Sequence, residues 1–361
     1  MRPPLLLVPG PVPLHPRVQE EMAKPALPHY GDAWVRAYTK AMDLLRYTWE
    51  APHARVFPVV GPGHAGLESL AHTFLRRGDR VVVVDNGFFG DRTREVLAAH
   101  RLQVDVVRSE WGGGPDLEGL RAALRQPARA VAVVHNETST GVTNPLREVV
   151  EAAHARGAFV LVDAVSSFAG LPLSFERLGV DGAFSASQKC LAAPAGIAPV
   201  CIADSLWESV DPEGVEGWYF NLFTWDRYAR DWGKWHPTPT TVSTNLFYAF
   251  LRALELVKEE GLQDRVARHA RVAARMRGGL AELDFRTLAP PELVSNTVAC
   301  VRLPSGADAA TVQQRLRDEH GIYVSGGLGP LHGKVLRIGT MGTQAEPEVA
   351  DAFLKALRAS L

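Results

Sequence analysis

The sequence contains few cysteines, carries almost no net charge and has no long hydrophobic segment. Its three cysteines, Cys190, Cys201 and Cys300, are odd in number and lack the spacing of a metal site. We therefore expect buried free thiols, no metal centre and a cytoplasmic protein. A net charge of −1 offers no attraction to nucleic acid or to an anionic membrane. No apolar run is long enough to span a bilayer, and Leu5 to Val8 is too short for a signal peptide.

The length of the chain predicts two domains. With 361 residues it exceeds the roughly 250–300 at which a single hydrophobic core stops growing. The composition, 46% hydrophobic and 22% charged, is that of an ordinary globular protein. We predict a large α/β domain over residues 16–243 and a smaller C-terminal α+β domain over residues 244–361, grouped with an N-terminal arm over residues 1–15.

Between residues 55 and 203, short β-branched runs alternate with amphipathic helical segments. Several of the runs are apolar throughout, as expected when helices cover both faces of a sheet. This pattern predicts a mostly parallel, seven-stranded sheet between helices. The predicted strands are Val56–Val60, Arg80–Val84, Val104–Val107, Ala130–His135, Ala158–Val162, Gly182–Ala186 and Ile197–Ile202.

Two other segments differ from this alternating region. After residue 243, helical patterns over residues 245–260 and 263–283 precede the shorter strands and helices of an α+β domain. The segment Trp207–His236 contains five of the eight tryptophans. Its aromatic, Arg and Asp residues suit a base-stacking surface, but the balanced charge argues against one. A subunit interface or an active-site wall is favoured.

An acid and a lysine follow two of the predicted strands. Asp163 ends the strand Phe159–Val162, and Lys189 follows the next strand on a turn of small residues. A pyridoxal phosphate site needs such a pair, because the lysine forms a Schiff base with the aldehyde and the acid keeps the pyridine nitrogen protonated. Taken singly, Asp163 is equally a turn cap and Lys189 a surface residue.

Two polar turns fall at the same predicted sheet edge. The turn Gly61-Pro62-Gly63-His64 lies between a strand and a helix, where glycines and free N–H groups suit an anion. The alternative is an ordinary Gly-Pro turn. The turn from His135 to Gly141 places hydroxyl groups where open α/β sheets bind ligands. The alternative there is a simple Ser/Thr-rich loop.

In their order along the chain, these motifs resemble those of the class V aminotransferases, which have the type I fold of pyridoxal phosphate enzymes. The alanine–glyoxylate and serine–pyruvate aminotransferases are the most similar members. The resemblance spans almost the whole chain. It is carried by Pro9-Gly10-Pro11, Gly63-His64, Asn86-Gly87-Phe88-Phe89-Gly90, Glu137-Thr138-Ser139-Thr140-Gly141, Val162-Asp163-Ala164-Val165, Ser187-Gln188-Lys189, His236-Pro237-Thr238, Gly326-Gly327-Leu328-Gly329-Pro330 and Val335-Leu336-Arg337-Ile338-Gly339.

The resemblance implies a role for each residue around the cofactor, pyridoxal 5'-phosphate. Lys189 would carry the cofactor and transfer the proton, and Asp163 would pair with the pyridine nitrogen. Thr138 would meet the phenolic oxygen, and Phe89 would stack on the ring in the place of a residue that is often tryptophan. The residues implied for the phosphate are Gly63, His64 and Gln188.

The resemblance also implies a homodimer with shared active sites, because Thr238 would reach the phosphate of the partner subunit. Trp235 stands where a tyrosine hydroxyl commonly makes the same contact, which an indole N–H puts in doubt. Arg337 would bind the substrate carboxylate bidentately. Tyr30 and Gly31 belong to the segment His29 to Trp34, which would lie near the substrate side chain; Tyr30 and Trp34 suggest a restricted pocket.

The predicted activity is transfer of an amino group from a small amino acid, alanine or serine, to glyoxylate or pyruvate in two ping-pong half-reactions. The single evident carboxylate-binding arginine disfavours aspartate and glutamate. A 2-aminoethylphosphonate transaminase and a β-eliminating lyase are the alternatives. A lyase of the desulfurase type needs a cysteine on a mobile loop, and neither Cys190 nor Cys300 lies in such a segment. A non-catalytic protein with the same fold is disfavoured, because Lys189, Asp163 and Arg337 are all retained.

Overall fold

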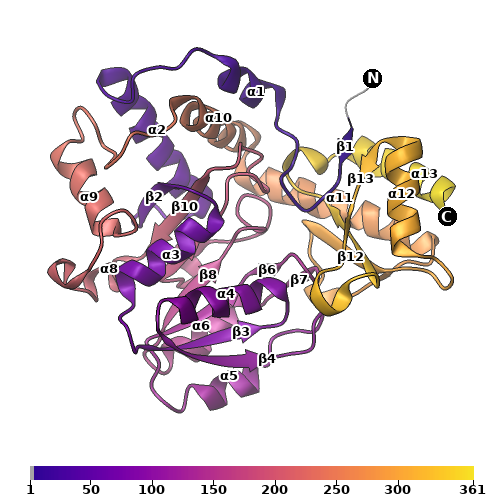
Figure 1. Cartoon of the computed structure of the whole chain (residues 1–361), viewed down its shortest axis with the longest axis horizontal. Coiled ribbons are helices and arrows are strands. Elements are labelled where there is room, and N and C mark those ends of the chain that lie inside the picture. The colour runs from indigo at the N-terminus through magenta and orange to yellow at the C-terminus, as the bar shows by residue number, and fades with distance from the viewer. Residues whose placement is uncertain (1–3) are drawn as a thin grey trace.

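The computed structural model describes residues 4–361, and its largest sheet has seven strands in the order β2-β10-β9-β8-β5-β3-β4 (Figure 1). Neighbouring strands are parallel except at β10, which is antiparallel to both of its neighbours. The α/β fold class with a mostly parallel seven-stranded sheet is confirmed. The strands are β2 (Arg55–Val60), β3 (Arg80–Asp85), β4 (Gln103–Arg108), β5 (Ala130–Val134), β8 (Phe159–Asp163), β9 (Gly182–Phe184) and β10 (Ile197–Ile202).

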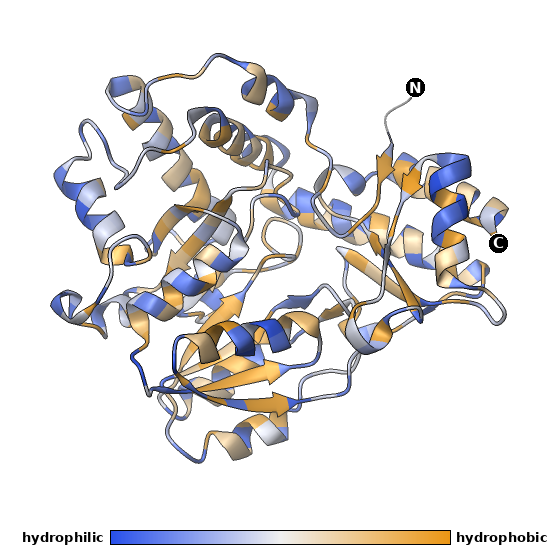
Figure 2. Cartoon of the chain, in the orientation of Figure 1, coloured by the Kyte–Doolittle hydropathy of each residue, from blue (hydrophilic) through white to orange (hydrophobic). Residues whose placement is uncertain are grey.

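Alternate side chains of each strand enter different cores on the two faces of the sheet. In β3, Val82 and Val84 belong to one core, and Val81 and Val83 belong to the other. Because both of their faces are buried, inner strands such as β3 and β5 are mostly apolar, as the hydropathy colouring shows (Figure 2), whereas the edge strand β4 carries exposed polar residues. The first core is covered by α1 (Pro16–Ala23), α2 (Asp32–Trp49), α5 (Leu117–Ala123), α6 (Leu146–His154) and α10 (Thr244–Glu260). The second is covered by α3 (Gly63–Phe74), α4 (Phe88–Ala99), α8 (Asp204–Glu208) and α9 (Leu222–Asp231).

A second, four-stranded antiparallel sheet forms the C-terminal part, at the right of Figure 1. Its strands are β11 (Arg286–Thr287), β12 (Val298–Arg302), β15 (Val335–Gly339) and β14 (Ser325–Gly326). The helices α11 (Leu262–Glu282), α12 (Ala309–His320) and α13 (Pro347–Ser360) contribute to its separate core. The domain limits remain a prediction; α10, which begins at Thr244, adds its buried side chains to the core of the large sheet.

The N-terminal arm connects the two parts. Its strand β1 (Leu5–Leu6) pairs in parallel with β13 (Ile322–Tyr323) beside the C-terminal sheet. A few residues later, the Val12 amide donates to the Gln188 carbonyl, next to Lys189. Within residues 4–361, no helix is both long and apolar enough to cross a membrane.

Candidate active site

A cavity of about 210 Å³ lies at the carboxyl edge of the large sheet. Seven residues predicted from the sequence to hold the cofactor line it: Gly63, His64, Phe89, Thr138, Asp163, Gln188 and Lys189. They come from the end of β8, from the residue after the short strand β6 (Asn136–Glu137), from the starts of α3 and α4, and from the turn after β9. The fold therefore gathers into one place residues that span 127 positions of the chain.

One end of the cavity has the properties of an anion site. The helix α3 begins at Gly63, and the amides of its first turn have no acceptor within the helix. A Cβ atom at Gly63 would stand 3.1 Å from Val165 Cγ2 and 3.2 Å from Ala186 Cβ, so a side chain there would crowd the wall. Gln188 supplies a buried amide whose Oε1 has no hydrogen-bond partner among residues 4–361. Burial lowers the pKa of His64, so its imidazole is neutral near pH 7.

Lys189 lines the same cavity in a confined, partly buried position. Its ammonium donates a hydrogen bond to the Pro9 carbonyl, so the N-terminal arm reaches the cavity. A Cβ atom at Gly10 would stand 2.5 Å from Lys189 Cδ, and Gly10 has φ of +89°; both features require glycine there. Burial lowers the pKa of Lys189 to about 8, which makes its free amine available near neutral pH.

Asp163 ends β8 with one stabilised carboxylate oxygen. Its Oδ1 accepts a hydrogen bond of 2.8 Å from the Val165 amide. Burial, with a contribution from the nearby charge of Glu137, raises the pKa of Asp163 to about 7. Such a carboxyl group is ready for a cationic partner, because pairing with a cation restores its ionised form.

Glu137 is the second buried carboxylate of this edge, and it accepts four hydrogen bonds. Oε1 accepts from the amide and hydroxyl of Ser139 at 3.0 and 2.6 Å. Oε2 accepts from the amides of Phe89 and Gly90 at 3.0 and 3.1 Å. Glu137 thus ties the first turn of α4, with its Phe89 ring, to the loop that follows β5.

Arg337 is a buried cation in β15, 8% exposed. Nε donates to the Gly326 carbonyl at 2.8 Å, and Nη1 makes a long contact of 3.4 Å with the Thr138 carbonyl. Within residues 4–361 its Nη2 has no hydrogen-bond partner and the guanidinium forms no ion pair. Burial lowers the pKa of Arg337, and the nearby charge of Glu137 offsets part of this effect.

Five predicted site residues lie outside the lining of this cavity: Arg337, which adjoins it through Thr138, and Tyr30, Gly31, Trp235 and Thr238. The Gly31 amide donates to the Trp235 carbonyl at 2.8 Å, and the rings of Tyr30 and Trp235 have centroids 5.6 Å apart. Tyr30 and Trp235 are 48% and 51% exposed. Thr238 is buried close by in sequence, and its hydroxyl donates to the Thr240 carbonyl at 3.0 Å.

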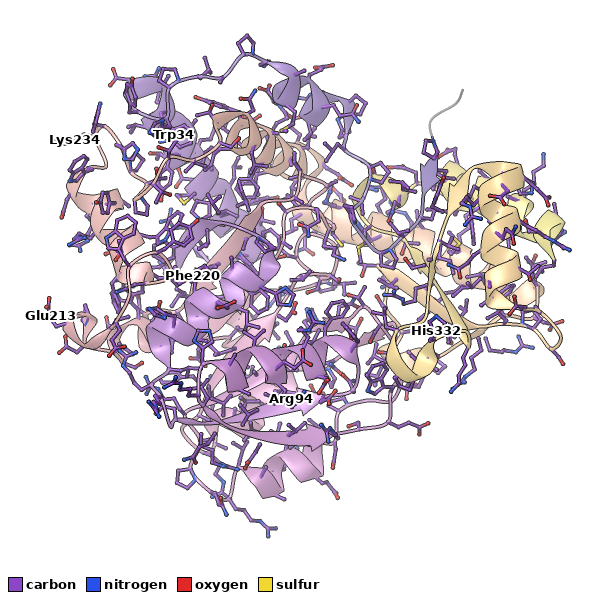
Figure 3. The ribbon with its side chains drawn as sticks, viewed as in Figure 1. Trp34, Arg94, Glu213, Phe220, Lys234 and His332 are labelled. Atoms are coloured by element: carbon purple, nitrogen blue, oxygen red, sulfur yellow. The ribbon has the colours of Figure 1, made fainter. Side chains whose placement is uncertain are left out.

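Trp34 is absent from the cavity lining as well. It lies on α2, fully buried in the first core, with its ring centroid 4.6 Å from that of Phe247. Figure 3 labels Trp34 and, in the loop just before Trp235, Lys234, both at the left of the molecule. The expectation that Trp34 restricts the substrate pocket is wrong, because Trp34 is buried on α2, a helix that was not predicted. Helical spacing points Trp34 inward with Tyr38 and Ala41.

The structure adds residues to the cavity that the sequence analysis had given no role. Arg92 and Thr93 line it beside Phe89, at the spacing of one helix face of α4. That spacing was a usable signal once a helix was predicted. Ser166, whose hydroxyl bonds to that of Thr138, carries no comparable signal, because the contact depends on the turn after β8.

These residues suit the cofactor that the motifs imply. The start of α3 and Gln188 would hold a phosphate, Lys189 would bind an aldehyde, and Asp163 would face a protonated ring nitrogen. The apolar and aromatic side chains of Val165 and Phe89 would enclose the ring. The orphaned Gln188 oxygen and the crowded Gly63 are the marks of a wall that a ligand completes.

Comparison with known proteins agrees with this chemistry. The family model for "Aminotransferase class-V" matches residues 20–360. The (S)-ureidoglycine–glyoxylate transaminase of Bacillus subtilis is 29% identical, over 99% of this chain and 90% of its own. The crystal structure of an alanine–glyoxylate aminotransferase from Nostoc sp. is similar with a TM-score of 0.94 and 32% identity, over 100% of this chain and 96% of that one. An aspartate aminotransferase of subgroup IV from Thermus thermophilus gives 0.90 and 30%, over 99% and 100%.

The family match covers residues 20–360, so it includes both large sheets and all the residues that line the cavity. It confirms the predicted enzyme class and the predicted cofactor, pyridoxal 5'-phosphate. The chain belongs to the class V aminotransferase family.

Proposed function

We propose that this aminotransferase moves an amino group from a small amino acid, alanine or serine, to glyoxylate or pyruvate. Glyoxylate is named for two of the similar proteins, the transaminase of Bacillus subtilis and the enzyme from Nostoc sp.. A third similar protein is named for aspartate, so the donor must be decided by the site itself.

The observation that carries the proposal is that the buried guanidinium of Arg337 forms no ion pair within residues 4–361. A buried guanidinium without an ion pair is costly, and a substrate carboxylate can compensate it with two parallel hydrogen bonds. Arg337 adjoins the cavity through its contact with Thr138, and the residues that line the cavity include one arginine, Arg92, whose Nε is paired with Glu95 at 2.9 Å. One carboxylate is therefore bound strongly, which favours a donor with an uncharged side chain.

Lys189 and Asp163 supply the proton chemistry. When bound, pyridoxal phosphate stabilises negative charge on the substrate Cα atom. Lys189 would hold the cofactor, and its amine, with a pKa near 8, would then move the Cα proton. Asp163 would keep the ring nitrogen protonated, and Glu137 would keep Phe89 against the ring.

The buried thiols argue against a lyase of the desulfurase type. Burial raises the pKa of Cys190 and of Cys300 to about 12. A thiol that is buried and protonated at neutral pH is not a nucleophile. Transamination is therefore favoured over elimination at this site.

The test is a donor screen on the purified holoenzyme. Alanine, serine, aspartate and 2-aminoethylphosphonate are each incubated with glyoxylate or pyruvate, and the products are quantified. We expect turnover with alanine or serine and little with aspartate. Preferred use of aspartate, use of the phosphonate, or release of ammonia instead of transfer would each overturn the proposed reaction.

We also propose a homodimer in which each subunit completes the site of the other. Tyr30, Trp218, Trp232 and Trp235 are 45–51% exposed, an unusual number of large aromatic side chains at a free surface. Thr238, which the family motif assigns to the phosphate, and Trp235, which stands where the family commonly has a tyrosine, do not line this chain's own cavity.

Mixing two variants tests the shared site. Lys189→Ala and Thr238→Val are each expected to be weak alone. After unfolding and refolding together, hybrid dimers would contain one intact site and recover part of the activity. A monomer in solution, or mixed variants with only the sum of their separate activities, would refute sharing.

A further inference from the structure

A second buried arginine, Arg265, lies behind the turn that carries Lys189. Arg265 is in the first turns of α11 and is 6% exposed. Unlike Arg337, it donates from all three of its nitrogens. Nε reaches the Ala169 carbonyl at 3.1 Å, Nη2 the Cys190 carbonyl at 2.7 Å, and Nη1 the Glu260 carboxylate at 2.7 Å.

The two carbonyls belong to the two segments that carry the chemistry. Cys190 directly follows Lys189, and Ala169 ends the turn that begins after Asp163. Ala169 has φ of +63°, a conformation that residues other than glycine rarely adopt, and this conformation presents its carbonyl to Arg265. A Cβ atom at Gly170 would stand 2.6 Å from Cys190 Sγ, so the two segments are in direct contact.

The base of this arrangement is itself held in place. Glu260 also accepts from Arg268, whose Nη1 donates to the carbonyls of Gly342 and Ala345. His269 Nε2 accepts from the Gly342 amide at 3.0 Å, and Nδ1 bonds to the Arg265 carbonyl at 2.8 Å. Burial lowers the pKa of His269 to about 3, so the ring is neutral and Nδ1 carries its proton. The guanidinium of Arg265 therefore has little freedom to move.

We propose that Arg265 is a positioning residue for the reaction, which sets the distance between the Lys189 turn and the Asp163 turn. The proposal rests on Lys189 being the residue that holds the cofactor. A displacement of about 1 Å in a reacting group can cost about a hundredfold in rate. Loss of Arg265 should thus slow steps that need Lys189 and Asp163 together, and should change substrate binding at Arg337 much less.

The experiment compares Arg265→Met, Arg265→Lys and Arg268→Met with the wild-type protein. The readouts are the rate at which the apoenzyme captures pyridoxal phosphate, the pH titration of the bound cofactor's absorbance, kcat and KM with alanine and glyoxylate, and Tm. Borohydride reduction followed by peptide mapping identifies the attached lysine. Arg275, which is exposed on the same helix as Arg265 and ion-paired with Asp351 of α13, provides the neutral control as Arg275→Met.

For Arg265→Met we expect the capture rate and kcat to fall about tenfold to a hundredfold, with KM changed less than about threefold and the absorbance titration shifted. Arg265→Lys should recover part of the loss, because an ammonium reaches one carbonyl well but not both. Arg268→Met shares Glu260 but does not touch the lysine turn, so it should lower Tm with a nearly normal capture rate.

Two results would overturn the proposal. One is a loss of Tm in Arg265→Met with capture rate, titration and kcat equal to those of Arg268→Met, which would show a purely structural role. The other is capture at the wild-type rate by Lys189→Ala, which would remove the lysine assignment itself. The mapped attachment site distinguishes these two failures.

Discussion

Two buried arginines, Arg265 and Arg337, differ in how completely their guanidinium groups are hydrogen-bonded. Arg265 uses all three nitrogens and has a carboxylate partner, whereas Arg337 has one good hydrogen bond and no ion pair within residues 4–361. Because an unpaired buried charge is costly, the saturated arginine belongs to the scaffold and the unsaturated one is prepared for a ligand. The two arginines are similarly buried, so the number of hydrogen bonds and ion pairs that each guanidinium makes, rather than its burial, separates the two roles.

The buried carboxylates Glu137 and Asp163 repeat this contrast. Glu137 accepts four hydrogen bonds and holds α4, whereas Asp163 accepts one. Burial raises the pKa of both carboxyl groups, that of Asp163 to about 7. The unsatisfied member of each pair, Asp163 or Arg337, is the one that the family motif assigns to cofactor or substrate.

The largest effect is expected at Lys189, the residue proposed to hold the cofactor. Lys189→Ala should lower turnover by at least about 10²–10⁴-fold, because the amine that moves the proton is removed. The visible absorbance of the attached cofactor should disappear as well. Absorbance spectra and product assays measure both, and retention of both would contradict the assignment.

The comparison of the arginines is tested directly by Arg337→Gln. Loss of a bidentate pair is expected to cost about 3 kcal/mol, or roughly a hundredfold in kcat/KM for the donor. Tm should stay equal or rise, because an uncompensated buried charge is removed. The exposed Arg358, paired with Glu282, serves as control in Arg358→Gln. A clear fall in Tm for Arg337→Gln would place it with the scaffold instead.

Asp163 predicts a pH dependence in the cofactor-free protein. Its folded-state pKa of about 7 exceeds the usual 3.8, so between about pH 4 and 7 the unfolded chain releases this proton while the folded chain keeps it. The free energy of unfolding should therefore fall by on the order of 2–4 kcal/mol as the pH rises from about 4 to about 7. Denaturant unfolding of wild type and Asp163→Asn at several pH values measures the difference, which should vanish near pH 4.

The lysine acts in the opposite direction at higher pH. Its folded-state pKa of about 8 lies below the usual 10.5, so stability lost by burying the charge returns as pH rises from 8 to 10.5. If the unfolding free energies of wild type and Asp163→Asn depend on pH in the same way, the pKa of Asp163 is not raised in the folded protein.

The smallest effect is expected for Glu137→Gln. An amide places N–H groups against two of the four donors, which should cost about 1–3 kcal/mol in unfolding free energy and loosen Phe89. Cofactor affinity should weaken with it. Glu151→Gln, an exposed residue of α6, is the control. Unchanged stability and unchanged cofactor affinity would contradict the proposal that the hydrogen bonds of Glu137 hold the first turn of α4 in place.

The elements that could be predicted from the sequence are those with a strong local pattern of hydrophobic residues. All seven strands of the large sheet are present, because apolar runs such as Val81–Val84 have no other stable location than a sheet covered on both faces. The helix α2 was missed, and Trp34 was therefore placed near the substrate rather than in the core. Its aromatic residues suggested a pocket before their helical spacing was considered.

Some residues of the candidate site could likewise be predicted from the sequence, and others could not. Residues that follow strands, such as Asp163 and Lys189, could be brought together in advance, because the carboxyl ends of parallel strands share one edge. Arg265 could not, since it acts on backbone carbonyls 75 and 96 residues away in sequence. A carbonyl acceptor has no sequence signature.

By itself, the sequence determined the α/β fold, the cofactor and the order of the motifs, because hydrophobic periodicity and residue chemistry are local properties. Only the tertiary structure decided which buried charges are satisfied and which await a partner. That distinction depends on hydrogen bonds between segments far apart in the chain, and it separates Arg337 from Arg265 and Asp163 from Glu137.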